Sequence, residues 1–371
     1  MKRLTVLFLL LLVAPAQAGT VEVRTHLDHG VEVRTYVFTA APGEVNQVTV
    51  EPVGEGFRLV DAGAPVTGAC PEGLCPEAYR LVVDLSDGDD TAIDRGGRIG
   101  EVSGGHGNDR LESDGGRMNG GEGDDTLIGG PGNNLLDGGP GQDALYGGPS
   151  NDGLLADGEG AAPVADLIDG GGGQDTATYT QRATPVRIEL ARDLGPEGDT
   201  LTSIEHATGG RADDVLIGDD AANNLDGAGG DDRIEGRGGD DYLEEDSGRD
   251  DVRGGAGDDR LELVGAHEVR CGSGLDRVNA IGGVVRLHAD CERARGGGPV
   301  LRLTGGTVTP RWDARRYPHG CRLRITLGGT PITAGRPTRV RHPATLRFTL
   351  ARGCRDVSGE PMHGQSFRLV R

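Results

Sequence analysis

The feature that most constrains this chain is a nine-residue repeat that runs without interruption through residues 120–155 as GGEGDDTLIGGPGNNLLDGGPGQDALYGGPSNDGLL. Its four units begin at Gly120, Gly129, Gly138 and Gly147. Each follows the pattern Gly-Gly-x-Gly-x-Asp-x-U-x with small departures, where U is a large apolar residue. A period this regular indicates stacked structural repeats rather than a globular fold.

Further units of the same pattern lie on both sides of this array. Single units begin at Gly104 and Gly170, and a second run of six units in unbroken register extends from Gly209 to Glu262. Residues 179–208 leave the pattern, and their strand-like segments indicate a β excursion that rejoins the repeats. The chain is therefore expected to be all-β and organised around a solenoid.

Composition and charge limit what such a solenoid can use to fold. Glycine makes up 67 of 371 residues and aromatic residues only 3%, so a conventional core would be poor. Residues 104–262 hold 37 Asp and Glu against 11 Arg. This acidic centre repels itself unless cations neutralise it, and it argues against nucleic acid as a partner.

The chemistry of one unit explains its spacing. Glycines at positions one, two and four permit a tight loop. The last three residues form a short strand, in which the apolar residue at position eight faces inward. A single file of Leu, Ile and Val is too lean to stabilise the fold alone. Position six carries Asp, and hard cations such as calcium prefer carboxylate and carbonyl oxygens, which a glycine-rich loop supplies.

The repeated pattern resembles the calcium-binding nonapeptide repeat of the hemolysin-type, or RTX, proteins, over residues 85–279. The resemblance implies a parallel β-roll in which two units make one turn, so that loops 18 residues apart stack and hold Ca²⁺ between them. The implied stacked pairs are Asp125 with Asp143, Asp214 with Asp232, Asp232 with Asp250, Asp241 with Asp259 and, weaker because Asn is neutral, Asn134 with Asp152 and Asn223 with Asp241.

Several ions are expected, and the candidate metal-binding residues are position-six aspartates together with loop glycines. The aspartates are Asp109, Asp125, Asp143, Asp152, Asp175, Asp214, Asp232, Asp241, Asp250 and Asp259. The glycines are Gly120, Gly123, Gly138, Gly141, Gly227, Gly230, Gly236, Gly239, Gly254 and Gly257. Because the second run offers more pairs at the 18-residue spacing, it is expected to contribute most of the binding.

Some loops of the second run depart from the pattern. The second Gly is replaced by Ala228 and Arg237, the fourth by Ala212 and Ala221, and the first pair by Glu245-Asp246. Sites that touch these loops are candidates for altered or empty sites.

The first residues of the chain predict export. Residues 1–18, MKRLTVLFLLLLVAPAQA, have a basic start, an apolar run and a small-x-small site, which is typical of a secretory signal peptide cleaved after Ala18. The apolar run is short for a membrane span, although a signal anchor is the alternative. No second apolar stretch of spanning length follows. The mature protein is therefore expected to be secreted, extracellular and without a transmembrane anchor.

The remaining segments divide into domains and disulfides. Residues 19–84 predict an N-terminal β cap, 85–292 the roll, 293–299 a glycine-rich linker and 300–371 a small basic β domain that resembles a sandwich. Six cysteines in an exported chain suggest disulfides, with 15 possible pairings. The simplest is three local pairs: Cys70 with Cys75, Cys271 with Cys291, and Cys321 with Cys354.

The sequence lacks the common catalytic motifs. It contains no H-E-x-x-H zinc motif, no G-x-S-x-G nucleophile elbow and no phosphate-binding loop. We therefore expect a non-enzymatic, secreted calcium-binding protein that folds on calcium outside the cell, with a structural, adhesive or cell-surface role. The alternative is a secreted hydrolase or toxin-like protein whose active site lies unrecognised in a terminal β domain.

The C-terminal domain has the opposite charge to the roll. Residues 296–371 hold 14 Arg against 3 acidic residues. This balance predicts either an anchor for an anionic cell wall or polysaccharide, or simply a solvated β surface.

Overall fold

The structure is a computed structural model that describes residues 19–28, 31–75, 80–155, 164–264, 267–274 and 276–281, and the backbone of further strands between residues 284 and 369. These residues contain strands and three single turns of 3-10 helix, with no α-helix among them. The predicted all-β fold is confirmed. No helical segment in this part of the chain has the length and apolar character of a membrane span.

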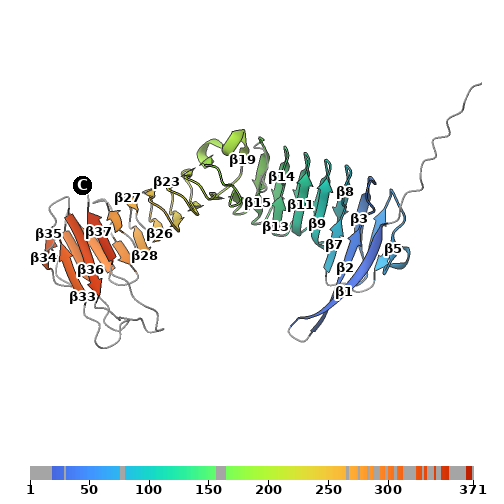
Figure 1. The fold of residues 1–371 in the computed structure, drawn as a ribbon, viewed down its shortest axis with the longest axis horizontal. Coiled ribbons are helices and arrows are strands. Elements are labelled where there is room, and N and C mark those ends of the chain that lie inside the picture. Colours follow the sequence, from blue (N-terminus) through green and yellow to red (C-terminus); the bar gives the residue numbers. More distant parts are fainter. Residues whose placement is uncertain are drawn as a thin grey trace, which may run out of the picture.

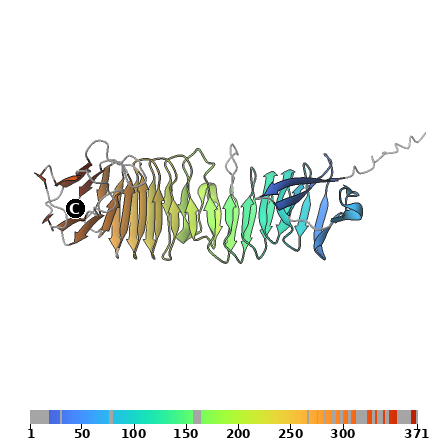
Figure 2. The same cartoon turned by 90° about the horizontal axis from the view of Figure 1, so that it is seen from below.

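The roll consists of two facing parallel sheets between which the chain alternates (Figures 1 and 2). The first sheet contains β7 (Arg80–Asp84), β9 (Ile99–His106), β11 (Gly116–Glu122), β13 (Asn134–Asp137), β15 (Gly153–Leu155), β17 (Thr176–Thr178), β20 (His206–Thr208), β22 (Asn224–Asp226), β24 (Tyr242–Glu245), β26 (Arg260–Val264) and β28 (Arg277–Ile281).

The opposite face of the roll is built from the alternate strands. They are β8 (Thr91–Asp94), β10 (Arg110–Ser113), β12 (Thr126–Gly129), β14 (Ala144–Gly148), β16 (Leu167–Gly171), β19 (Thr200–Thr202), β18 (Arg187–Glu189), β21 (Val215–Ile217), β23 (Arg233–Gly238), β25 (Asp251–Ala256) and β27 (Glu268–Ser273). Each regular turn advances by 18 residues, as in the parallel pairing of Leu127 with Leu145.

The core between the sheets is a file of position-eight side chains on each face. On one face this file is fully buried at Leu111, Leu127, Leu145 and Ile168. Residues of the file pair with one another across neighbouring strands, as Leu111 does with Leu127. Burial of one such side chain contributes about 1.5–3 kcal/mol, but each turn supplies only two of them. The expected thin core is confirmed.

The pairing of neighbouring strands, rather than a constant number of residues per turn, keeps the strands of the roll in register. Residues 113–119, which lie between the unit that begins at Gly104 and the one that begins at Gly120, form a shorter half-turn whose Met118 pairs with Val102 before it and Leu136 after it. Met118 is fully buried, like the position-eight residues. A loop can therefore lose two residues without moving its strand out of the sheet.

The excursion between β17 and β20 divides the second sheet. It contains β18, η2 (Leu190–Arg192), η3 (Pro196–Gly198) and β19. β19 pairs with β16 and β18 pairs with β21, and between β18 and β19 there are only the isolated bridges of Leu194. The first sheet continues directly from β17 to β20. One face therefore carries an extra strand, and Figure 1 shows the roll bending near β19.

Two hairpins cover the first turn of the roll. β1 (Thr20–Asp28) and β2 (Val31–Thr39) form one, and β2 pairs in parallel with β7. β3 (Gln47–Val53) and β4 (Gly56–Asp61) form the other, and β3 pairs in parallel with β8. Both sheet edges are thus protected from pairing with other chains.

Disulfide-bonded cysteines lie at both ends of the roll. After β5 (Thr67–Gly68), the predicted Cys70–Cys75 disulfide closes η1 (Pro71–Gly73) and β6 (Leu74–Cys75). Cys271 is also disulfide-bonded. The predicted partner Cys291 and the predicted pair Cys321 and Cys354 lie outside the described residues.

The last strands extend both sheets of the roll. The first sheet continues through β30 (Arg293–Gly296), β31 (Val300–Thr304), β32 (Thr307–Arg311) and β35 (Thr338–Arg339). The second continues through β29 (Val284–Leu287), β37 (Gln365–Leu369), β36 (Ala344–Leu350), β33 (Leu323–Leu327) and β34 (Thr330–Pro331). The predicted linker at 293–299 therefore begins with a strand, because β30 pairs with the free edge of β28.

Candidate metal sites between the turns

The position-six aspartates lie at the ends of the loops, immediately before the strands, and they are buried. One oxygen, Oδ1, accepts a hydrogen bond from the backbone N–H of the position-six residue one turn earlier. Asp143 accepts from Asp125 at 2.8 Å, Asp232 from Asp214 at 2.7 Å, and Asp259 from Asp241 at 3.0 Å. Each carboxylate therefore ties two consecutive turns together.

The other oxygen, Oδ2, has no hydrogen-bond partner and is inaccessible to solvent at most of these positions. This holds for Asp90, Asp109, Asp125, Asp143, Asp152, Asp175, Asp232, Asp241 and Asp259. A buried anionic oxygen without a donor or a counter-charge is costly. A series of them along the roll fits a set of cations bound between the turns.

Position-one glycines leave room beside these oxygens. A Cβ on Gly120 would collide with Asp125 Oδ2 and lie 2.6 Å from the carbonyl oxygen of Gly138 in the next turn. A Cβ on Gly236 would meet Asp241 Oδ2 and the Gly254 carbonyl in the same way. The space kept open by glycine is bounded by a carboxylate and a carbonyl oxygen, which are the ligands that calcium prefers.

The predicted glycines thus have two different roles. Those at position one, including Gly120, Gly138, Gly227, Gly236 and Gly254, border the carboxylates of the loops. Those at position four have positive φ and make the tight turn, namely Gly123, Gly141, Gly230, Gly239 and Gly257.

The carboxylates form rows that follow the faces of the roll. In the first half they comprise Asp90, Asp109, Asp125, Asp143, Asp166 and Asp199 on one face and Asp152, Asp175 and Glu205 on the other. In the second half they comprise Asp214, Asp232 and Asp250, and Asp241, Asp259 and Asp276. All the predicted 18-residue pairs are brought together, including Asn134 with Asp152 and Asn223 with Asp241.

Pairs at other spacings escaped the sequence reasoning. Asp109 N–H donates to Asp125 across 16 residues, and Asp143 N–H donates to Asp166 across 23. Glu205 Oε2 accepts from Asp175 N–H across 30 residues. The first half therefore has a longer row than its 18-residue pairs indicated, and the second run has no majority of stacked carboxylates.

Two of the altered loops rearrange their carboxylate or amide. In the loop with Ala212, Asp214 Oδ2 accepts a hydrogen bond of 2.5 Å from the Gly210 N–H of its own loop. In the loop with Ala221, Asn223 Oδ1 accepts one of 2.8 Å from the Asp219 N–H. Asp214 therefore differs from the other predicted ligands, because both of its oxygens have backbone donors.

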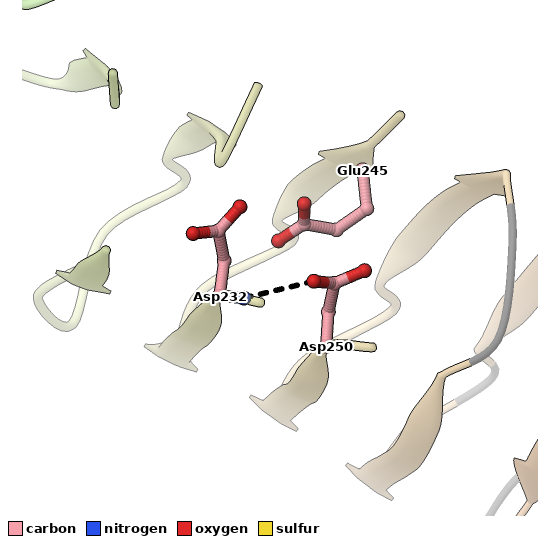
Figure 3. Close-up of side chains that lie close together, drawn as sticks. All are labelled: Asp232, Glu245 and Asp250. Carbon is pink, nitrogen blue, oxygen red and sulfur yellow. Dashed lines mark hydrogen bonds between the residues drawn. The ribbon is translucent and has the colours of Figure 1, made fainter. Parts of the chain in front are cut away.

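Another altered loop adds a carboxylate. Glu245, at position one, points into the gap between two turns toward Asp232 and Asp250 (Figure 3). One turn further on, His267 stands at position six, and its Nδ1 is 2.6 Å from Asp250 Oδ2. The row of carboxylates on this face ends at Asp250. From the sequence, Glu245 was identified only as a departure that could alter or empty a site, and His267 was not identified, because neither matches the Gly or Asp expected at its position.

Burial raises the pKa values of these carboxyl groups. Desolvation, reinforced by neighbouring carboxylates, brings the pKa of Asp143 to about 8 and those of Asp125, Asp232 and Asp241 to about 7. Each Oδ1 hydrogen bond lowers the pKa but does not offset the desolvation. In the absence of a cation, burial therefore favours the protonated, neutral form of these carboxyl groups.

A comparison with known families agrees with the geometry of these loops. The family model of the RTX calcium-binding nonapeptide repeat, found in four copies, matches residues 119–154, 208–243 and 246–262. These three segments of the roll are RTX calcium-binding repeats. No curated protein matches the chain. Calcium supplies positive charge, and the residues that would hold it here are the position-six carboxylates and the position-one carbonyls.

Replacing Asp143 by Asn tests a single RTX carboxylate. Asp143 faces Asp125 on one side and Asp166 on the other. Asn keeps the Oδ1 acceptor but removes the charge, so we expect calcium affinity at the adjoining gaps to fall about tenfold or more. Titration calorimetry measures this. Asp124→Asn, an exposed change in the neighbouring loop, is the control, and equal behaviour of the two variants would contradict the assignment.

The raised pKa values also predict how pH affects the calcium-free roll. Because the folded-state values of about 7–8 exceed the value of 3.8 for an ordinary Asp, the protonated fold is favoured at low pH. That stability is lost as pH rises from about 4 to 8. In EGTA, we expect more β signal in circular dichroism at pH 5.5 than at pH 8. With calcium present the trend reverses, because protons compete for the same oxygens. A calcium-free β signal that falls on acidification would refute this account.

Proposed function

We propose that this protein is a secreted, non-catalytic calcium-binding protein whose RTX roll folds on calcium outside the cell and acts as a rigid structural element of the cell exterior. The observation that carries the proposal is the set of buried, unpartnered Oδ2 atoms along the roll. Extracellular calcium modules commonly bind at about 10⁻⁴–10⁻³ M, so a roll of this kind remains unfolded where calcium is scarce and folds after export.

The shape of the molecule supports a structural role. The strands from β7 to β28 on one face are joined by ten successive pairings. At about 4.8 Å for each pairing, the roll is about 48 Å long. The N-terminal hairpins lie at one end and the C-terminal strands at the other (Figure 2). A calcium-rigidified roll would hold these two ends apart.

Small-angle X-ray scattering tests the spacer role. With calcium, the scattering should fit an elongated particle of constant cross-section, and EGTA should convert it to the profile of a flexible chain. A compact particle in calcium would exclude the spacer. A screen against glycan, ester and peptide substrates tests the absence of catalysis, since turnover that follows a terminal segment would favour the hydrolase alternative.

Export and surface attachment form the finer part of the proposal. Cleavage after Ala18 would be established by a mature N-terminus at Gly19 in the culture medium. The Arg-rich segment at 300–371 is proposed to hold the protein to an anionic wall or polysaccharide. Sedimentation with cell envelopes at low and high salt tests this, because screening releases an electrostatic anchor; binding that ignores salt would count against it.

A further inference from the structure

Glu245 occupies a place in the roll that the repeat reserves for glycine. It is the last residue of β24 and the first of the unit 245–253. Its side chain is fully buried, at 0% exposure, and neither Oε1 nor Oε2 has a hydrogen-bond partner. A long anionic side chain rarely occupies an interior position unless a charge or a donor meets it.

The carboxylate of Glu245 lies in the gap between two turns, where the other loops have a glycine. A Cβ on Gly227, at position one of the preceding turn, would lie 2.5 Å from each oxygen of Glu245 and 2.8 Å from Asp232 Oδ2. Ligand atoms from Asp232, Glu245 and Asp250 all lie within 4.8 Å of one another. Figure 3 shows the three side chains converging from two adjacent turns.

We propose that Asp232, Glu245 and Asp250 form a three-carboxylate calcium site that binds more tightly than the other sites of the roll. The inference rests on the proposed function in that calcium is the cation the roll takes up. Most gaps between turns are lined by two position-six side chains and backbone carbonyls, whereas this gap has a third formal negative charge. Affinity for calcium rises with the number of charged ligands in a site.

Figure 3 also explains why Glu245 is suited to this place. The backbone N–H of Asp232 donates to Asp250 Oδ1 at 2.8 Å, which fixes the two aspartates on adjacent turns. Glu245, at the end of β24, lies at the start of the loop that leads to Asp250, and its side chain reaches the two aspartates from there. Without a cation, three buried carboxyl groups in one gap repel one another. Glutamate in the place of the repeat's glycine thus makes this turn the one most dependent on calcium. We expect this site to bind calcium before the other sites of the roll.

Calcium titration of the full chain by calorimetry, with native mass spectrometry to count ions, tests this site. The variants are Glu245→Gln, which keeps the size and removes the charge, and Glu245→Gly, which restores the glycine of the repeat. The control is Glu122→Gln, which removes an exposed carboxylate from another loop. In the wild type we expect a tight phase of one ion. Both Glu245 variants should weaken that phase at least tenfold, and Glu122→Gln should leave it unchanged.

The outcomes separate this site from the proposed function. Circular dichroism in saturating calcium verifies that each variant folds; if Glu245→Gln does not, Glu245→Gly still decides the question. Equal or tighter binding by the folded variants would overturn the proposal and show that Glu245 fills the gap as an uncharged side chain. Absence of any calcium binding by the wild type would instead overturn the function proposed for the roll as a whole.

Discussion

Excess EGTA at pH 8 is expected to abolish most of the β-sheet signal of the protein, and calcium in excess of the chelator is expected to restore it. At this pH Asp125 and Asp232 are mostly ionised, because burial raises their pKa only to about 7, and Asp143, whose pKa rises to about 8, is about half ionised. Without cations, the roll must hold these charges in its interior with only two apolar side chains per turn. A chain with high charge and few large apolar residues favours disorder.

The size of this effect follows from mass action. Each calcium ion that binds only the folded state adds about 2.7 kcal/mol when its concentration is 100 times the dissociation constant. Several ions therefore contribute on the order of the whole stability of an ordinary domain. Magnesium is the control, because it requires near-octahedral geometry and retains its waters, so it should restore little of the signal. Far-UV circular dichroism records the change. A β spectrum that EGTA leaves intact would mean that the roll folds without calcium.

The fold could be predicted from the sequence because the large apolar residue of each unit can only face the interior. An apolar residue at position eight of each nine-residue unit, such as Leu127 or Leu145, must face the interior, and the glycines around it permit only a short loop. The nine-residue period therefore predicts strand, loop and stacking together. It also predicts the buried carboxylate pairs, because the same register that stacks these leucines stacks Asp125 on Asp143.

What the sequence did not predict arises where stacking compensates for changes in length. Asp109 and Asp125 stack although they are 16 residues apart, and Asp175 and Glu205 although they are 30 apart. The strands remain in register because inter-strand hydrogen bonds and the buried file hold them, and the loops absorb the difference. A fixed spacing of 18 residues cannot locate these pairs. The alternation of buried and exposed positions around Met118 and Ala207 gives part of the information that would locate them.

The roles of Glu245 and His267 were missed for another reason. The repeat pattern marks a residue that departs from it only as a sign of an altered or empty site. The effect of a departure depends on where the side chain points, which only the structure gives. Glu245 points into the gap and adds charge, whereas the loops of Ala212 and Ala221 turn their own amides toward Asp214 and Asn223.

Gly120→Ala is expected to remove calcium from one gap of the roll and to lower the melting temperature. Gly120 does not have a positive φ, so Ala causes no backbone strain there. Its Cβ would collide with Asp125 Oδ2 and lie 2.6 Å from the Gly138 carbonyl oxygen. Both neighbours are held by the stacking of adjacent turns. Overpacking of this kind costs about 1–3 kcal/mol, and loss of an ion adds about 2.7 kcal/mol at 100 times its dissociation constant.

Gly172→Ala is the matched control for this experiment. Gly172 also lies in a repeat loop, but the nearest atom to an added Cβ is 3.7 Å away and its φ permits a side chain. This variant should bind as many ions as the wild type and melt at the same temperature or slightly higher. The comparison of ion number and melting temperature between the two variants decides the role of position one. If Gly120→Ala matched Gly172→Ala in both, position one would not require glycine, and the gap beside Asp125 would not be a calcium site.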